Sequence, residues 1–148
     1  MPVEITFIRH GQTEGNAAGR WQGHTNSSLT ALGQEQAARL AAQLAEKHFD
    51  LVIASDLGRT VETALALGRP IEKDERWREP FFGTWEDATT DEIAGDGTGR
   101  LAGLMAGEDV ALGGGERLSE VMHRTHEALD HVVSRVGDGA SVAIVSHG

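Results

Sequence analysis

Short apolar runs and longer amphipathic segments alternate along this chain. The apolar runs cover residues 3–8, 51–54 and 141–145, and each has the length of one β-strand. After Ser141 the last run is apolar at every position, which is typical of a strand that is covered on both faces. We therefore predict a sheet with helices on both sides.

Three longer segments have the periodicity of amphipathic helices. The first covers residues 30–48 and begins with Thr30, which can cap its first turn. The second is predicted to begin at Asp56 as its N-cap and to end near Leu67, before a glycine and a proline. The third covers residues 116–136. Its apolar stripe consists of Leu118, Val121, Met122, Thr125, Leu129, Val132, Val133 and Val136.

Strands that alternate with helices are typical of a parallel sheet with right-handed crossovers. We therefore predict an α/β fold, a three-layer α/β/α sandwich with a mostly parallel central sheet, formed by residues 1–148 as a single domain. The segment 80–115 interrupts the alternation and is rich in glycine, with the runs GDGTG and GGG. We expect this segment to be a lid-like excursion with short helices near Thr90 and Arg100.

Composition and charge exclude several classes of protein. With 13 Lys and Arg residues against 23 Asp and Glu residues, the chain has a formal net charge of −10, which disfavours nucleic-acid binding. The chain has no cysteine, so it can form neither disulfides nor thiolate metal sites. No apolar run approaches the roughly 20 residues of a membrane span, and the start MPVEITFIRHG lacks the basic region of a signal peptide. We expect a cytoplasmic protein without nucleic-acid or membrane partners.

Reactive side chains follow each of the three predicted strands. The first strand is followed by Arg9 and His10, the second leads to Arg59, and the third is followed by His147. Because parallel strands end at the same edge of a sheet, we expect these side chains to lie close together. Arginines can bind a phosphoryl group through paired hydrogen bonds, and a neutral imidazole can attack its phosphorus atom. One histidine before a glycine is usually a turn residue, but three strand ends with compatible chemistry favour phosphoryl transfer.

Longer motifs surround these residues. In chain order they are Arg9-His10-Gly11-Gln12-Thr13-Glu14 with Asn16 and Gln22-Gly23, Leu29-Thr30-x-x-Gly33, Ser55-Asp56-Leu57-x-Arg59-Thr60-x-x-Thr63-Ala64, Arg78-Glu79-x-x-x-Gly83-x-Trp85-Glu86, Gly114-Gly115-Glu116 and Val145-Ser146-His147-Gly148. Together they resemble the histidine phosphatase superfamily, the phosphoglycerate-mutase-like proteins. The resemblance covers the whole chain and implies a metal-independent phosphatase that needs no cofactor.

The resemblance also implies a role for each matched residue. His10 would be the nucleophile that becomes phosphohistidine. Glu79 would first protonate the leaving oxygen and then activate water. The phosphate pocket would be formed by Arg9, Asn16, Gln22, Gly23, Arg59, His147 and Gly148.

These roles require particular protonation states. His10 must be neutral to attack phosphorus, and cationic neighbours favour that form. His147 is expected to be a cation that stabilises the phosphoryl oxygens together with the two arginines. Glu79 must be protonated to act as an acid, so it needs a partly desolvated site. Candidates to desolvate its carboxyl are Phe81, Phe82 and Trp85.

The chain departs from the usual pattern of the family in several places. Asp87 stands where a glycine usually follows Trp-Glu, Arg117 stands where a serine is usual, and Pro80 directly follows the predicted acid. Family members usually continue for some tens of residues past Ser-His-Gly, so we expect this chain to lack that C-terminal segment. None of these departures removes a predicted catalytic group.

No metal site is predicted. His123, His126 and His131 lie opposite the apolar stripe of the third helix, where a solvated face is the simpler interpretation. The glycines at 113–115 do not form a phosphate-binding P-loop, because no Gly-Lys-Ser/Thr follows them.

The favoured function is hydrolysis of a small phosphorylated metabolite. A phosphoglycerate-type phosphomutase would use the same residues, but such mutases usually carry insertions for which the stretch between Arg59 and Glu79 has little room. A non-catalytic phospho-ligand-binding domain would need neither His10 nor Glu79. Residues 72–96 contain nine acidic and three basic residues, a net charge of −6, which favours substrates with a single phosphate. A homodimer is left open.

Overall fold

Four parallel strands form the central sheet of the computed structural model, which describes residues 1–148. They are β1 (Glu4–Arg9), β2 (Leu51–Ala54), β3 (Glu72–Lys73) and β4 (Ser141–Ser146), in the order β1-β4-β2-β3. Every pair of neighbours is parallel. The three predicted strands and the parallel sheet are confirmed. The edge strand β3 escapes prediction because it consists of only two residues, both charged.

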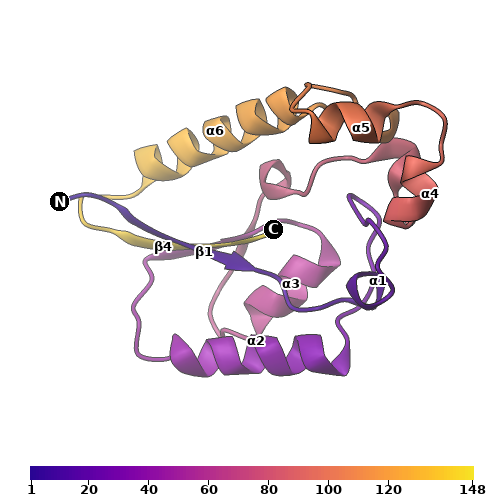
Figure 1. Cartoon of the computed structure of the whole chain (residues 1–148). Helices are drawn as coiled ribbons and strands as arrows, with labels where there is room; N and C mark the ends of the chain where they lie inside the picture. The colour runs from indigo at the N-terminus through magenta and orange to yellow at the C-terminus, as the bar shows by residue number, and fades with distance from the viewer.

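Helices cover both faces of the sheet (Figure 1). The helices α2 (Ala31–Gln43) and α3 (Gly58–Leu65) lie on one face, and α6 (Leu118–Arg135) lies on the other. The chain crosses the sheet in one direction through α2 and α3 and returns through α6. Right-handed crossovers therefore place α6 on the opposite face from α2 and α3. The predicted three-layer sandwich is confirmed.

Each face of the sheet buries its own apolar cluster. Alternate residues of a strand point to opposite faces, so Val52 packs toward α2 and α3 while Ile53 packs toward α6. The first cluster contains Ile8, Phe49, Val52, Ala54, Ala64, Ala143 and Val145. The second contains Ile53, Trp77, Ala128, Val132, Val142 and Ile144. Burial on both faces explains why the last strand has no polar alternation.

Two predicted helix boundaries are corrected. Thr30 caps α2 as predicted, since its side chain accepts a hydrogen bond from the backbone N–H of Gly33, but the helix ends at Gln43 rather than at residue 48. Asp56 is not the N-cap of α3. The cap position is Leu57, which has no side-chain hydrogen bond, and the Asp56 carboxylate instead accepts two hydrogen bonds from Arg78. A distant arginine thus replaces the local capping contact.

The apolar stripe of α6 is narrower than predicted. Ala128 and Val132 are fully buried against the sheet, whereas Leu118, Met122 and Val133 are 41%, 58% and 44% exposed. The stripe is therefore centred on the side of the helix that carries Ala128. The three exposed residues lie beside that contact line, where the sheet does not reach them.

The segment 80–115 lies beyond the ends toward which the strands point (Figure 1). It contains the predicted short helices, α4 (Thr90–Ala94) and α5 (Arg100–Met105), together with the 3₁₀ turns η2 (Gly83–Trp85) and η3 (Leu112–Gly114). A separate apolar cluster holds it together, formed by Phe82, Trp85, Ile93 and Leu112, with Trp21 packed against them. Its function as a lid stays a prediction.

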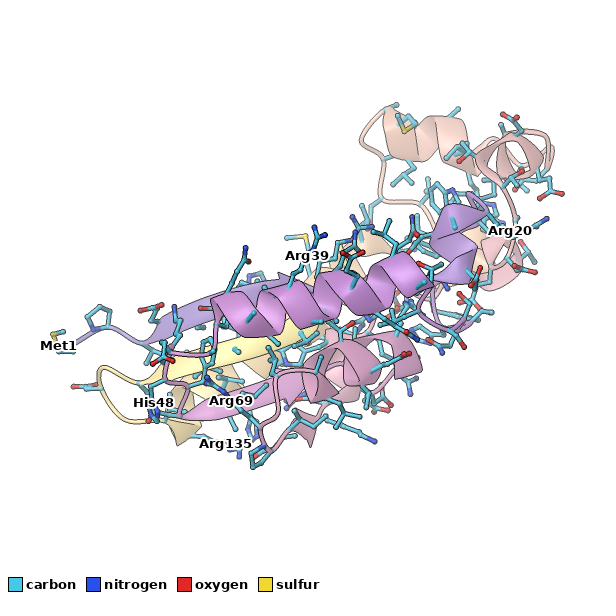
Figure 2. All side chains as sticks on the ribbon, turned by 90° about the horizontal axis from the view of Figure 1, so that it is seen from below. Met1, Arg20, Arg39, His48, Arg69 and Arg135 are labelled. Atoms are coloured by element: carbon cyan, nitrogen blue, oxygen red, sulfur yellow. The ribbon has the colours of Figure 1, made fainter.

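Two short elements flank the strand ends. The helix α1 (Glu14–Ala17) follows β1, and the 3₁₀ turn η1 (Glu75–Trp77) follows β3. Figure 2 shows that His48 and Arg69 lie at the end of the molecule near Met1, away from the carboxyl ends of the strands. No helix is both long and apolar enough to cross a membrane.

Candidate active site

His10 is held in a buried position directly after β1. Its Nδ1 lies 2.7 Å from the carbonyl oxygen of Gly11, and the residue is only 7% exposed. Because a carbonyl can only accept a hydrogen bond, Nδ1 carries the proton and Nε2 carries the lone pair. Burial, helped by Arg59 and Arg9, lowers the pKa of His10 from 6.5 to about 4. The imidazole is therefore neutral, as predicted, with a free nucleophilic nitrogen.

The turn after His10 needs glycine. A Cβ on Gly11 would collide with the backbone carbonyl of Gly33, at the start of α2. The backbone N–H of Gly11 donates a hydrogen bond of 3.0 Å to Oγ1 of Thr63 on α3. The turn is thus fixed between two helices, which positions the ring of His10.

Arg59 is completely buried in the first turn of α3. Its two terminal nitrogens donate to the carbonyl oxygens of Thr25 and Gly23 at 2.9 and 2.6 Å, and also to Oδ1 of Asn26 at 3.3 Å. The remaining donor of one terminal nitrogen contacts Oε2 of Glu79 at 2.8 Å. Nε has no partner. A buried cation with an unused donor is well suited to bind an anion.

Glu79 shares this buried site, and its side chain is 19% exposed. Burial raises the pKa of the Glu79 carboxyl, although Arg59, Arg9 and the backbone N–H of Gly23 act in the opposite direction. The desolvation therefore outweighs the ion pair. Of the aromatic residues predicted to desolvate this carboxyl, Phe82 and Trp85 pack in the separate cluster of segment 80–115, and Phe81 is 41% exposed.

His147 follows β4 and faces the same site. Its ring centroid is 5.2 Å from that of His10, and its Nδ1 is 3.9 Å from Oε2 of Glu79. Burial, together with the positive charge of Arg59, lowers the pKa of His147 from 6.5 to about 2. The expectation that His147 is a cation is therefore wrong for the free protein. Its imidazole is neutral because burial desolvates the ring, and the positive charge of Arg59 acts in the same direction.

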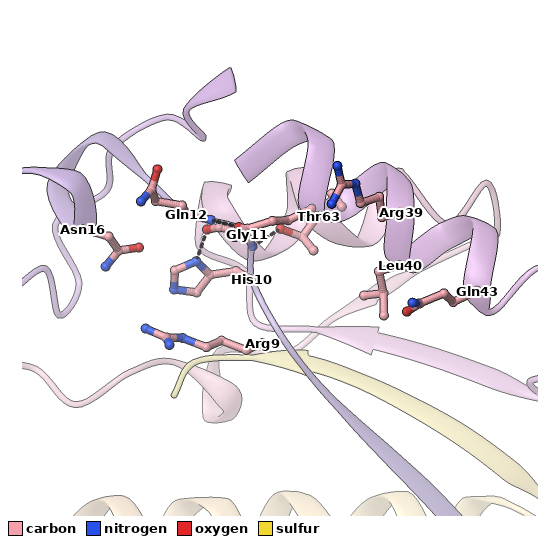
Figure 3. Close-up of a pocket in the computed structure, with 11 residues that line it drawn as sticks. Arg9, His10, Gly11, Gln12, Asn16, Arg39, Leu40, Gln43 and Thr63 are labelled. Atoms are coloured by element: carbon pink, nitrogen blue, oxygen red, sulfur yellow. Dashed lines mark hydrogen bonds between the residues drawn. The ribbon is translucent and has the colours of Figure 1, made fainter. Parts of the chain in front are cut away.

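The remaining predicted pocket residues differ in what they offer. Arg9 is exposed and lies beside the ring of His10 (Figure 3). Asn16 uses its carbonyl oxygen to accept a hydrogen bond from the backbone N–H of Thr13, and its amide nitrogen makes no hydrogen bond. A Cβ on Gly148 would come within 2.8 Å of the Arg9 side chain, so this glycine leaves room for that arginine.

Gln22 and Gly23 support the site through the loop after α1. The Gln22 amide accepts a hydrogen bond from Thr13 at 2.7 Å and donates one to Ser27 at 2.5 Å, so both of its ends are occupied. Gly23 has a φ of +56° and presents its carbonyl oxygen to Arg59. In this structure both residues shape the loop that holds Arg59. Their direct contact with phosphate stays a prediction.

A cavity of about 560 Å³ opens beside His10 (Figure 3). Arg9, His10 and Asn16 line one part of it, and Gln12, Gln36, Arg39 and Gln43 line the part along α2. This cavity gives a ligand access to His10 from solvent. No group of three or more His, Asp or Glu side chains in the structure is arranged to hold a metal ion.

Two ion pairs that the sequence did not reveal hold the segment that carries Glu79. The Arg78 guanidinium binds Asp56 through two hydrogen bonds of 2.6 Å. Arg124 on α6 donates to the carbonyl oxygens of residues 76, 78 and 79 at 2.7, 2.8 and 3.1 Å, and it also pairs with Glu116. No spacing rule links an arginine in the middle of a helix to a loop 45 residues earlier. The quoted motifs contain Asp56, Arg78 and Glu116, but they do not indicate these pairings.

The arrangement can therefore bind an anion and attack it with a histidine. Four side chains converge at this edge of the sheet. The neutral His10 follows β1, and the buried Arg59 lies in the helix after β2. Glu79, whose pKa is raised, lies in the segment after β3, and His147 follows β4. The predicted convergence of strand ends is confirmed.

Comparisons with known proteins agree with this geometry. The chain is 34% identical to the glucosyl-3-phosphoglycerate phosphatase of Mycolicibacterium vanbaalenii, over 97% of this chain and 68% of that protein. It is 36% identical to the probable phosphoglycerate mutase GpmB of Serratia proteamaculans, over 99% of this chain and 70% of that protein. The solved structure of Bacillus stearothermophilus YhfR superimposes with a TM-score of 0.87 at 36% identity, over 99% of this chain and 74% of that one.

The model of the histidine phosphatase superfamily, branch 1, matches residues 5–148. This match includes all three strand ends and every predicted site residue. The chain belongs to the histidine phosphatase superfamily, and the phosphoglycerate-mutase-like fold and phosphatase class implied by its motifs are confirmed.

Proposed function

We propose that this protein hydrolyses phosphomonoesters through a phosphohistidine on His10. The observation that carries the proposal is the tautomer of His10, whose Nδ1 proton is bound to a carbonyl so that Nε2 is free to attack. A pKa of about 4 keeps this nitrogen unprotonated at neutral pH. A residue that served only to bind phosphate would not need a buried, neutral imidazole.

In the first step, Nε2 of His10 forms a bond to phosphorus while the bond to the leaving oxygen breaks. The phosphoryl oxygens are stabilised by Arg59 and Arg9, and the Nε–H of Arg59, which has no partner in the structure, is available to them. Glu79 donates its proton to the leaving oxygen. The product alcohol departs and the phosphoryl group stays on His10.

Binding of the substrate prepares Glu79 for this task. In the free protein the carboxylate is paired with Arg59 at 2.8 Å. A phosphate dianion that competes for Arg59 removes this positive partner and adds negative charge nearby. Both changes raise the pKa of Glu79 further and favour the protonated acid.

In the second step, water attacks phosphorus as the bond to Nε2 of His10 breaks. Glu79, now ionised, accepts the proton from the water. Inorganic phosphate is released, and both side chains return to their starting states. The cycle uses no group beyond those of the chain and one water molecule.

The substrate class that fits is a small metabolite with one phosphate. The M. vanbaalenii relative is named for glucosyl-3-phosphoglycerate, and the S. proteamaculans relative is named for phosphoglycerate. The acidic segment 72–96, with a net charge of −6, lies around the proposed acid and disfavours polyanions. Phosphorylated three-carbon acids and their sugar derivatives therefore come first in the search for a substrate.

A second candidate function is a phosphoglycerate-type mutase, because one similar protein is named as a probable enzyme of this kind. A mutase would return the phosphoryl group of His10 to a second hydroxyl instead of to water. The two functions differ in their product. Hydrolysis releases inorganic phosphate, whereas a mutase yields an isomer without phosphate release.

The test is a phosphate-release assay across a panel of phosphorylated metabolites, with isomer formation measured in parallel. His10→Ala serves as the blank, and His123→Ala, which changes an exposed histidine on α6, serves as the matched control. We expect phosphate release by the wild type and by His123→Ala but none by His10→Ala. Turnover that survives in His10→Ala would overturn the mechanism, and isomer formation without phosphate release would establish the mutase.

The acid role of Glu79 is tested by leaving group. Glu79→Gln should lose about 10²-fold or more in kcat/KM, which reports the phosphorylation step alone, for alkyl phosphates, whose leaving oxygen must be protonated. It should lose far less for an aryl phosphate with an acidic phenol, which leaves without a proton. Equal losses for both substrates would remove Glu79 from the acid role.

A further inference from the structure

A buried hydroxyl group lies directly behind His147. Ser55, the residue that follows β2, is fully buried, and its Oγ is 3.0 Å from Nε2 of His147. The same oxygen accepts a hydrogen bond of 3.4 Å from the backbone N–H of Leu57. These two contacts are the only hydrogen bonds of the Ser55 hydroxyl. Since Leu57 is a donor, the hydroxyl proton has one acceptor within reach, Nε2 of His147.

This geometry determines the tautomer of His147. Buried hydroxyl groups almost always donate their proton, so Ser55 donates to Nε2, which must carry a lone pair. In a neutral imidazole the remaining proton is then on Nδ1. The opposite arrangement, in which Nε2–H donates to Ser55, would leave a fully buried hydroxyl proton without an acceptor.

The other nitrogen of His147 faces the reaction site. Nδ1 is buried and has no hydrogen-bond partner, and it lies 3.9 Å from Oε2 of Glu79. The ring of His10 is on the same side, at a centroid distance of 5.2 Å. A buried N–H without a partner, close to both the proposed nucleophile and the proposed acid, is free to donate a hydrogen bond to an oxygen atom.

We propose that Ser55 is a positioning residue that holds His147 as its Nδ1–H tautomer. A neutral His147 then donates a hydrogen bond to a phosphoryl oxygen, so the site stabilises the transferred group without a second buried cation. The identity of the anion rests on the function proposed above. The tautomer itself rests only on Ser55, Leu57 and His147.

The first experiment measures the tautomer without any assay of activity. The imidazole nitrogens of the protein, labelled with ¹⁵N at histidine, are observed by two-bond ¹H–¹⁵N correlation at neutral pH. The signals of His147 are assigned by their loss in His147→Asn. We expect a protonated Nδ1 and an unprotonated Nε2. A proton on Nε2, or on both nitrogens, would overturn the proposal.

The second experiment separates a positioning role from a structural one. Ser55→Ala should lose about ten-fold or more in kcat, with a smaller change in KM, because a misdirected donor stabilises the transition state poorly. The matched control is Ser141→Ala, which removes a buried hydroxyl that has no hydrogen-bond partner at the start of β4. This control should keep wild-type kcat.

A variant with both Ser55→Ala and His147→Asn completes a double-mutant cycle. In the His147→Asn background, Ser55→Ala should cause almost no further loss of kcat, because its effect acts through His147. Independent, multiplicative losses would overturn the positioning role. If Ser55→Ala does not fold, the tautomer of His147 in the wild-type protein still tests the proposal. If the wild type releases no phosphate from any substrate, the proposed function fails while the tautomer measurement keeps its meaning.

Discussion

The carboxyl edge of the sheet and the segment 80–115 are both well packed, but with opposite kinds of side chain. All seven buried polar or charged residues of the protein lie in the stretches after β1 and β2, namely His10, Thr13, Gln22, Ser55, Arg59, Thr60 and Thr63. The cluster of segment 80–115 consists instead of four apolar residues. At the sheet edge the buried side chains include the polar and charged groups of the candidate site, whereas in segment 80–115 the buried side chains are apolar and hold the segment together.

This difference separates what each region contributes. Burying ionisable groups is unfavourable unless hydrogen bonds compensate, and at the sheet edge it lowers the pKa values of His10 and His147 and raises that of Glu79. Burying Trp85 and Phe82 is favourable in itself. Substitutions at the edge should therefore change activity most, and substitutions in the excursion should change stability most.

The largest effect on stability is expected for Trp85→Ala. Trp85 is 1% exposed, and its indole N–H donates a hydrogen bond of 2.8 Å to Asp96. Removal of a buried tryptophan should lower the free energy of unfolding by about 3–5 kcal/mol, measured by urea denaturation. Met105→Ala, at a site that is 81% exposed on α5, should lower it very little. A Trp85→Ala protein as stable as the wild type would show that the apolar cluster of segment 80–115 does not contribute to stability as described.

Acid should lower the stability of the protein through the ionisable groups at the sheet edge rather than through the apolar cluster of segment 80–115. His10 has a folded-state pKa of about 4 against 6.5 when unfolded, a difference of 2.5 units, so the unfolded state binds its proton first. The stability contributed by this group is fully present above pH 6.5 and is lost as the pH falls toward 4. That loss is about 3 kcal/mol for His10 alone.

Urea denaturation at pH 7 and at pH 4 measures this loss. His10→Gln removes the titrating group, so its stability should decline less between the two pH values than that of the wild type. Ile93→Val, in the apolar cluster of segment 80–115, changes no titrating group or its hydrogen bonds and should keep the wild-type pH dependence. The same decline in His10→Gln and wild type would contradict the assigned pKa.

The smallest effect on activity is expected for Arg124, which does not belong to the reacting groups but holds the backbone that carries Glu79. Arg124→Met removes the hydrogen bonds to the carbonyls of residues 76, 78 and 79 and should misplace Glu79. We expect a loss of about ten-fold in kcat/KM, larger for alkyl than for aryl phosphates. Arg135→Met is the matched control, since Arg135 lies on the same helix as Arg124 but pairs with Glu72 of β3 in an exposed ion pair. Equal kcat/KM values for the two variants would remove Arg124 from this role.

The sequence predicted the sheet and the site for the same reason. Apolar runs and the motifs that follow them are local signals, and parallel strands bring their ends together without further information. The excursion 80–115 has no such periodicity. Its cohesion depends on the packing of Trp21 against Phe82 and Trp85, which are about 60 residues away in the chain.

The errors have a common physical origin in tertiary contacts. Asp56 has the right residue type and position for an N-cap, but Arg78 competes for its carboxylate. The role of stabilising the phosphoryl oxygens together with two arginines predicts a cationic His147, yet burial beside Arg59 keeps its imidazole neutral. Burial and long-range partners, which no spacing reveals, decide both cases.

If His10 carries the phosphoryl group during turnover, the phosphoenzyme can be trapped. The experiment is rapid quenching of the wild-type protein during turnover of an aryl phosphate, followed by mass analysis of its peptides. We expect the mass of one phosphoryl group on the peptide that contains His10, stable in alkali, labile in acid and absent from His10→Ala. Phosphate release with no phosphoenzyme at any quench time, or with the phosphoryl group on another residue, would contradict this expectation.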